Sequence, residues 1–208
     1  LTPYSLLQIG SLLEGNGHHL ELIDANALNL SFEELEKRMK EIEYEILIFK
    51  FTPTSFFNDT EVAKISKKLN PKAKTIGICY SLWPIARQVM EEAKELDIYI
   101  GHEYEAVTPN LMLNMEDLSK VDGIAYRYNG SIIVNKDAAP ISDYDSLPLP
   151  AFHLLPSLDP YYISVNHGKP FTIMYTSKGC PYDCIYCNVS RSKVKMKSAE
   201  RTMEEIRY

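Results

Sequence analysis

Short apolar runs typical of strands alternate with longer segments of helical periodicity in the first half of the chain. This alternation limits the possible folds more than any other feature. The expected helices cover residues 6–13, 32–42, 58 or 59 to 69, and 85–96, and the expected strands cover residues 19–23, 46–49, 75–79 and 98–100. Strands separated by helices of this length form parallel βαβ units. The pattern predicts an α/β fold with a Rossmann-like, doubly wound parallel sheet over residues 1–118.

The ends of these elements carry their own signals. Ser31 directly precedes the second expected helix, where its hydroxyl can cap the first turn, and Glu33 and Glu34 favour the positive end of the helix dipole. Doubly wound domains begin on a strand that is usually central in the sheet, whereas this chain opens on a helix. We therefore expect a further strand ahead of Leu1.

After the sheet region, a hairpin is expected around Asn129-Gly130, with strands at residues 124–127 and 132–134. Residues 137–170 are rich in Pro, Asp and Ser, and we interpret residues 119–169 as the hairpin and an ordered linker. A strand is expected at residues 170–176 from its β-branched and aromatic content. Thr202 and Glu205 have capping-box spacing, so a helix is expected to begin at Thr202.

Three of the four cysteines, Cys180, Cys184 and Cys187, fall within eight residues with the spacing C-x-x-x-C-x-x-C. Three thiolates on one loop can each hold one iron of a cubane 4Fe-4S cluster and leave the fourth iron without a protein ligand. Tyr186 adds an aromatic face beside that open iron, where a flat group can stack. The spacing therefore predicts an iron–sulfur site with a place for chemistry.

Two other uses of the three thiols have to be weighed. A zinc site could recruit His153 or His167, but structural zinc sites usually pair two Cys/His knuckles, and the sequence has no second knuckle. Disulfides would leave one of the three cysteines odd, and the first residues do not have the pattern of a secretory signal. Free thiols fit a reducing compartment, so a cytoplasmic protein is expected.

Charge and hydropathy exclude two further classes. The net charge of −6 argues against a general nucleic-acid surface, because phosphate neutralisation needs clustered Lys and Arg. We interpret one small basic cluster, which consists of Arg191, Lys193, Lys195 and Lys197, as a solvated loop. No apolar run approaches the roughly 18 residues of a membrane span. We expect no nucleic-acid partner and no span.

The cysteine segment resembles the radical S-adenosylmethionine (SAM) superfamily through Lys178-Gly179-Cys180-Pro181-Tyr182-Asp183-Cys184-Ile185-Tyr186-Cys187. The resemblance implies that the three cysteines bind the cluster and that the amino and carboxylate groups of SAM bind the fourth iron. It also implies that Tyr186 lies against the adenine. In this family the loop follows the first strand of a (β/α)₆ barrel, so residues 170–208 are expected to be the start of a truncated barrel.

The whole chain is similar to the cobalamin-dependent class of radical SAM enzymes. The matching stretches are residues 6–26, Gly101-His102-Glu103-Tyr104-Glu105, Gly123-Ile124-Ala125-Tyr126-Arg127 and Asp143-Tyr144-Asp145-Ser146-Leu147-Pro148-Leu149-Pro150-Ala151-Phe152. In that class cobalamin lies over the carboxyl ends of the sheet strands. The residues expected there are Thr52, Thr54, Ser55, Tyr80, Ser81, His102 and Glu103. The hydroxyls of Thr52, Thr54 and Ser55 are suited to the amides of the corrin ring or to its nucleotide tail.

This class often has two adjacent glycines where the chain has Gly77-Ile78-Cys79. Cys79 is expected to be a small buried side chain rather than a cobalt ligand. His18 and His19 are expected at the surface.

The resemblance implies an enzyme that cleaves SAM reductively with its cluster and methylates an unactivated carbon of a small molecule through cobalamin. It also implies an electron donor such as flavodoxin or ferredoxin. Two alternatives stay open: a cobalamin-dependent cyclase or rearrangement enzyme, and a radical SAM protein whose first domain is a docking module without cobalamin. These 208 residues alone are expected to be inactive, because they hold only the start of the barrel.

Overall fold

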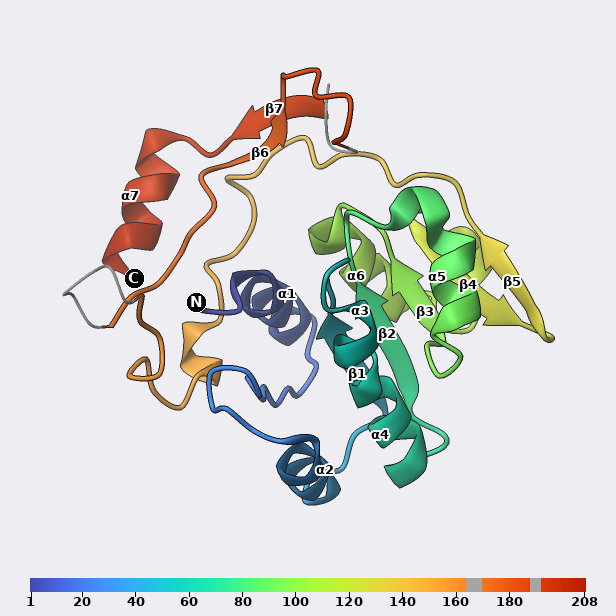
Figure 1. Cartoon of the computed structure of the whole chain (residues 1–208). Helices are drawn as coiled ribbons and strands as arrows, with labels where there is room; N and C mark the ends of the chain where they lie inside the picture. Colours follow the sequence, from blue (N-terminus) through green and yellow to red (C-terminus); the bar gives the residue numbers. More distant parts are fainter. Residues whose placement is uncertain (164–169, 188–191) are drawn as a thin grey trace. The chain divides into compact units, whose positions relative to one another are not determined.

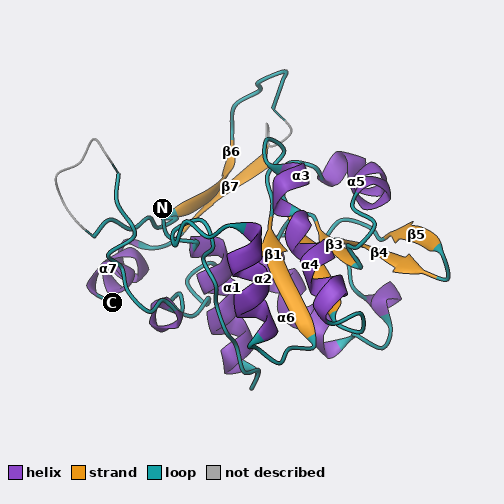
Figure 2. Ribbon diagram, turned by 60° about the horizontal axis from the view of Figure 1, so that its bottom comes forward, coloured by secondary structure: helices purple, strands orange, loops and turns teal. Residues whose placement is uncertain are grey.

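The computed structural model describes residues 1–163, 170–187 and 192–208. Its contacts divide the chain into two compact units, Leu1–Leu28 with Ile141–Tyr208, and Asn29–Pro140. The first unit contains α1 (Tyr4–Gly15), η3 (Phe152–Leu154), β6 (Ser177–Cys180), β7 (Ser192–Met196) and α7 (Ala199–Arg207). The second contains α2 (Phe32–Lys40), β1 (Ile46–Lys50), α3 (Phe56–Asp59), α4 (Glu61–Leu69), β2 (Lys74–Ile78), η1 (Trp83–Ile85), α5 (Ala86–Glu92), β3 (Ile98–Ile100), α6 (Tyr104–Leu113), η2 (Leu118–Lys120), β4 (Ile124–Tyr128) and β5 (Ser131–Val134) (Figures 1 and 2). His167 and Arg191 lie outside the described residues.

One sheet organises the second unit. Its strand order is β1-β2-β3-β4-β5; β1, β2 and β3 are parallel, and β4 and β5 are antiparallel to their neighbours. The α/β class and the parallel strands are therefore as predicted. The predicted hairpin forms as β4 and β5, and it extends the same sheet through pairing of Ile98 with Tyr126. Its turn uses left-handed Asn129 (φ 48°) and Gly130 (φ 77°), the conformation that an Asn-Gly hairpin turn requires.

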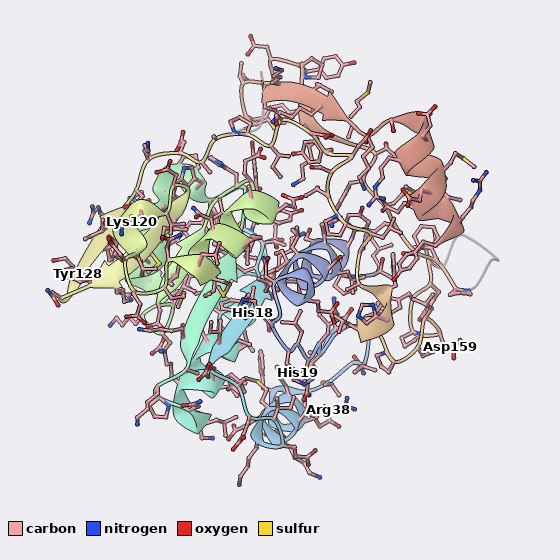
Figure 3. All side chains as sticks on the ribbon, turned by 180° about the vertical axis from the view of Figure 1, so that it is seen from behind. His18, His19, Arg38, Lys120, Tyr128 and Asp159 are labelled. Carbon is pink, nitrogen blue, oxygen red and sulfur yellow. The ribbon has the colours of Figure 1, made fainter. Side chains whose placement is uncertain are left out.

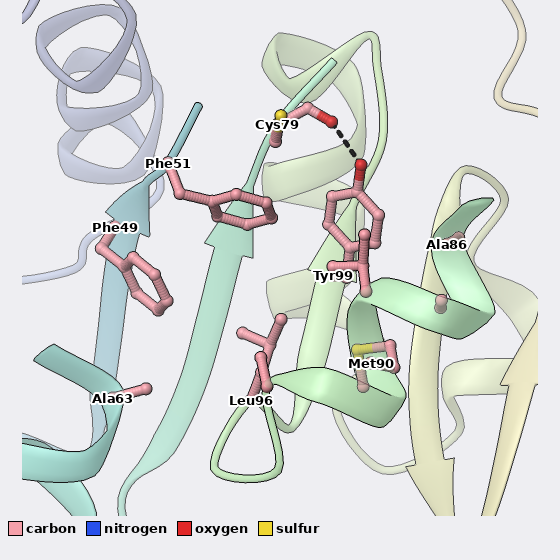
Figure 4. Packing of buried hydrophobic residues seen from close by; sticks show 11 residues of the cluster. Phe49, Phe51, Ala63, Cys79, Ala86, Met90, Leu96 and Tyr99 are labelled. Carbon is pink, nitrogen blue, oxygen red and sulfur yellow. Dashed lines mark hydrogen bonds between the residues drawn. The ribbon is translucent and has the colours of Figure 1, made fainter. Parts of the chain in front are cut away.

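One face of this sheet packs against side chains of α4 and α5. Phe49, Gly77, Tyr99 and Ala125 are register partners on one face. They pack with alanine, valine and methionine side chains of α4 and α5, namely Ala63, Ala86, Val89 and Met90 (Figure 4). A side chain at Gly77 would meet the Phe51 ring at 2.8 Å, so the glycine makes room for that ring.

The helices of this unit differ from the prediction in some of their bounds and in one additional helix. The helix expected up to Leu69 is divided into α3 and α4, and α5 ends at Glu92, earlier than expected. Helix α6 was not predicted, because its sequence is apolar around most of its circumference and contains Pro109. The Ser31 cap is confirmed: its side chain accepts a hydrogen bond from the Glu34 amide in a complete capping box.

The first unit is built around α1. Leu7 packs with Leu155 and Tyr161, and Leu22 lies against the same cluster. The strand expected at residues 19–23 is wrong, because this segment is irregular and its apolar side chains serve the cluster instead of a sheet. His18 and His19, which follow α1, are exposed as expected (Figure 3).

The C-terminal part of this unit also departs from the barrel expectation. Residues 171–175 are irregular, and the pairing begins only at Ser177, where β6 runs antiparallel to β7. The expected first barrel strand at residues 170–176 is therefore wrong for this structure. Helix α7 begins after Ser198, whose side chain accepts from the Arg201 amide, so the cap expected at Thr202 is also wrong.

A buried ion pair joins α1, the residue that follows β7, and α7. The Lys197 and Glu205 side chains are 5% and 2% exposed and form an ion pair with each other. Tyr4 donates its hydroxyl hydrogen to Glu205 Oε1 (2.5 Å) and accepts from the Lys197 ammonium at 2.8 Å. The interpretation of Lys197 as part of a solvated loop is wrong, because this lysine neutralises a buried carboxylate.

Candidate functional site

The three clustered cysteines lie at the end of β6 and on the loop that follows it. Cys180 is the last residue of that strand, and its amide donates to the Ser192 hydroxyl at 2.9 Å. Cys184 and Cys187 close a turn, in which the Cys187 amide donates to the Cys184 carbonyl at 3.0 Å. Tyr186 stands at the tip of this turn with 89% of its surface exposed. All three thiols are free and partly exposed.

Gly179 sets the path of the chain into this loop. Its φ of +92° is a left-handed conformation, and the ladder between β6 and β7 is irregular between Lys178 and Cys180. A Cβ atom at this position would lie 2.3 Å from the Lys193 carbonyl oxygen. A bulge of this kind needs glycine, and it shifts the pairing register so that Cys180, the last residue of β6, pairs with Ser192 where the loop begins.

The donor chemistry of this loop fits an iron–sulfur cluster, since thiolates are the ligands that such clusters take. In the described ranges the structure gathers no three His, Cys, Asp or Glu side chains into a metal-binding group. The loop therefore carries the right donors and would have to close around a cluster. The zinc alternative gains no support from His153, whose ring bonds Glu14 at 2.9 Å.

The residues predicted at the carboxyl ends of the parallel strands do lie at one edge of the second unit's sheet. The loops after β1, β2 and β3 leave this edge together, because the strands are parallel and in register. Phe51 and Cys79 continue the pairing, with their amides donating to Ile78 and Ile100 at 3.1 and 3.2 Å. The prediction that these loops share an edge is thus confirmed, and their role in binding stays a prediction.

The loop after β1 gathers three hydroxyls and one carboxylate. The Thr52 hydroxyl lies 2.7 Å from that of Ser55 and 3.0 Å from that of Thr54. Ser55 donates to Asp59 Oδ2 at 2.5 Å, and the Thr52 amide donates to the same oxygen at 3.2 Å. Sequence reasoning missed Asp59, although its position four residues after Ser55 brings the two side chains together when a helix begins between them.

Aromatic rings gather over the ends of β2 and β3. The His102 ring lies 5.5 Å from Tyr80 and 5.6 Å from Trp83, measured between ring centroids. The Trp83 indole sits directly on Gly101, where a Cβ would meet it at 2.2 Å, and its Nε1 donates to Asp137 at 2.8 Å. Tyr80 is 40% exposed, so this cluster offers an aromatic face to solvent. Ser81 is exposed, and Glu103 (φ 55°) is the N-cap residue that directly precedes α6.

Cys79 lies beneath these loops and is 3% exposed. Burial raises the pKa of its thiol, and burial also raises the pKa of Tyr99, whose hydroxyl donates to the Cys79 carbonyl at 2.6 Å (Figure 4). A neutral buried thiol is a poor nucleophile and a poor metal ligand. The prediction that Cys79 is a small buried side chain is confirmed.

Known proteins resemble this chain over nearly its whole length, although no protein-family model matches it. An uncharacterized methyltransferase of Pyrococcus horikoshii is 27% identical over 212 residues, which cover 98% of this chain and 45% of that protein. The anaerobic magnesium-protoporphyrin IX monomethyl ester cyclase of a Synechocystis species is 28% identical over 193 residues, which cover 90% and 38%. The chain thus spans less than half the length of these curated relatives.

Among solved structures, the radical SAM methyltransferase TsrM of Kitasatospora setae, with cobalamin and a [4Fe-4S] cluster bound, has a similar fold. The TM-score is 0.72 at 13% sequence identity, and the match covers 99% of this chain and 42% of TsrM. At this identity the likeness concerns the fold alone. The cysteine segment and the linker resemble those of cobalamin-dependent radical SAM proteins, and the sequence relatives and the fold are consistent with that resemblance. In the described part of the chain, no helix is both long and apolar enough to cross a membrane.

Proposed function

We propose that this chain belongs to a radical SAM enzyme in which Cys180, Cys184 and Cys187 hold a 4Fe-4S cluster. The observation that carries this proposal is the set of three free, partly exposed thiols on one loop at the spacing C-x-x-x-C-x-x-C. Three thiolates leave one iron open, which is the position that SAM would take. Tyr186, exposed at the tip of the same turn, would cover the adenine.

The sheet edge of the second unit is proposed to hold cobalamin. The hydroxyls of Thr52, Thr54 and Ser55 would bind the periphery of the corrin, and the loops carrying Tyr80, Ser81, His102 and Glu103 would flank it. When bound, the cluster supplies an electron for SAM cleavage, and cobalamin supplies methyl transfer. The protein's own residues then orient these groups and exclude water from them.

Methylation of an unactivated carbon of a small molecule is the proposed overall reaction. Ring closure is the second candidate, because one relative of comparable identity is a cyclase. An electron donor such as flavodoxin or ferredoxin would reduce the cluster. The free thiols support a cytoplasmic location, and the net charge of −6 supports a protein without a general nucleic-acid surface.

The test uses the full-length protein, purified and reconstituted without oxygen. Iron and sulfide content, 5′-deoxyadenosine formation from SAM, and the corrin absorption spectrum are measured in the wild type and in single Cys→Ala variants. We expect C180A, C184A and C187A to lose iron and SAM cleavage, and C79A, the matched control, to keep both. Stoichiometric zinc in place of iron would overturn the proposal. Methylated product per SAM cleaved separates methyl transfer from ring closure, and a loaded protein without a corrin spectrum would indicate a docking domain.

A further inference from the structure

We propose that Asp59 fixes the direction of the Thr52, Thr54 and Ser55 hydroxyl hydrogens in the loop after β1, so that these three hydroxyls offer only hydrogen-bond acceptors to a ligand. On this basis the hydroxyls bind N–H donors, such as the primary carboxamides on the rim of a corrin, and not the phosphate of its nucleotide tail. The inference rests on the proposed function, in which cobalamin lies at this edge of the sheet.

The first step is the bond between Ser55 and Asp59. A carboxylate only accepts hydrogen bonds, and a serine hydroxyl has one hydrogen to donate. Because Ser55 Oγ lies 2.5 Å from Asp59 Oδ2, that hydrogen is directed at the carboxylate. The Thr52 amide donates to the same oxygen at 3.2 Å, which holds the carboxylate in place against the loop backbone. Ser55 is left with lone pairs only.

The single hydrogen of each threonine hydroxyl can be assigned in the same way. Thr52 Oγ1 lies 2.7 Å from Ser55 Oγ, and since Ser55 has no hydrogen left, Thr52 must be the donor. Thr54 Oγ1 lies 3.0 Å from Thr52 Oγ1, whose hydrogen is now used, so Thr54 must donate in turn. All three hydroxyl hydrogens are therefore directed along this series of hydrogen bonds, which ends at Asp59. Thr54 begins the series.

The order of these hydrogen bonds decides which groups the loop presents to a ligand. Thr52 and Thr54 are exposed, and the lone pairs of their oxygens are what a ligand meets. An amide N–H₂ group can donate to these lone pairs. An ionised phosphate or carboxylate can only accept, so its oxygens would face the partial negative charges of the hydroxyl oxygens and the negative charge of Asp59 behind them. The Asp59 carboxylate thus makes three otherwise adaptable hydroxyls selective for donors.

The test compares hydroxocobalamin with derivatives in which one ring-side carboxamide is hydrolysed to a carboxylate, using the full-length protein and absorption titrations. We expect at least one derivative to bind the wild type about tenfold more weakly or worse. In D59A the hydroxyls are released to rotate and donate, so this discrimination is expected to fall toward one.

A second variant keeps the test valid if D59A folds poorly. T54V removes the terminal acceptor with little change in shape and is expected to weaken hydroxocobalamin binding several-fold. T60V is the matched control, because the Thr60 hydroxyl is buried and donates to the Phe56 carbonyl at 2.8 Å. Equal affinity for all derivatives, or an unchanged T54V, would overturn this inference alone. Absence of hydroxocobalamin binding by the wild type would overturn the proposed cofactor, and the inference with it.

Discussion

Replacing Gly179 with alanine should open the β6–β7 hairpin that carries the cysteine loop. Gly179 has a φ of +92°, which costs an L-residue with a side chain about 1–2 kcal/mol. Its new Cβ would also lie 2.3 Å from the Lys193 carbonyl oxygen and 2.8 Å from its carbon, so the β7 backbone must move, which adds about 1–3 kcal/mol. Together these effects lower the free energy of hairpin opening by about 2–5 kcal/mol.

Hydrogen exchange of the paired amides in β6 and β7 measures that opening free energy directly. A loss of 2 kcal/mol or more corresponds to a fall in protection of about 30-fold or more, since about 1.4 kcal/mol is a factor of ten. Gly130→Ala is the matched control, because Gly130 has a φ of +77° but no atom within 4 Å of the new Cβ. It should show only the conformational cost, in its own β4–β5 hairpin. Equal losses in the two variants would refute the argument from close packing.

Three further changes test other parts of the structure. Glu205→Gln should destabilise the first unit by about 3–5 kcal/mol in denaturant unfolding, because it leaves the buried Lys197 without its anion. Its control is Glu204→Gln, in a pair whose carboxylate is 58% exposed, which should change stability by less than about 1 kcal/mol. Equal effects of the two substitutions would contradict the burial argument. Ser31→Ala should cost about 1 kcal/mol by removing the cap of α2, and an unchanged unfolding midpoint would count against the capping box. Iodoacetamide should modify Cys180, Cys184 and Cys187 in the folded, metal-free protein, and Cys79 only after unfolding, because burial shields that thiol and raises its pKa; early labelling of Cys79 in peptide mass spectra would show the shielding to be wrong.

Local signals predicted the elements that local physics controls. The strands at Ile46–Lys50 and Ile98–Ile100 follow from short apolar runs between helices, and the Asn129-Gly130 turn follows from its need for positive φ. The irregular segments at residues 19–23 and 171–175 have strand-like composition, but a strand also needs a neighbouring edge, and no local pattern contains that edge. The N-terminus of α7 was misplaced because Ser198 and Thr202 are both suitable caps, and the structure uses Ser198.

The candidate site also has one part that local sequence predicts and another that depends on the fold. The cysteine spacing is a local property, so the metal-binding residues can be proposed from the sequence alone. The partners of the strand-end hydroxyls depend on how the loop after β1 folds back on α3, which is why Thr52, Thr54 and Ser55 were named and Asp59 was not. The approach of Trp83 to Gly101 joins two loops far apart in the sequence and follows only from the sheet that places them side by side.

The most direct test of the central claim is the electron paramagnetic resonance spectrum of the reduced full-length protein, recorded with and without SAM. Three thiolate ligands leave one iron open, so SAM should bind that iron and change the signal of a reduced 4Fe-4S cluster. The C79A variant should behave like the wild type, and each of C180A, C184A and C187A should lack the signal. A cluster signal that SAM leaves unchanged, or one that survives these three substitutions, would contradict the account.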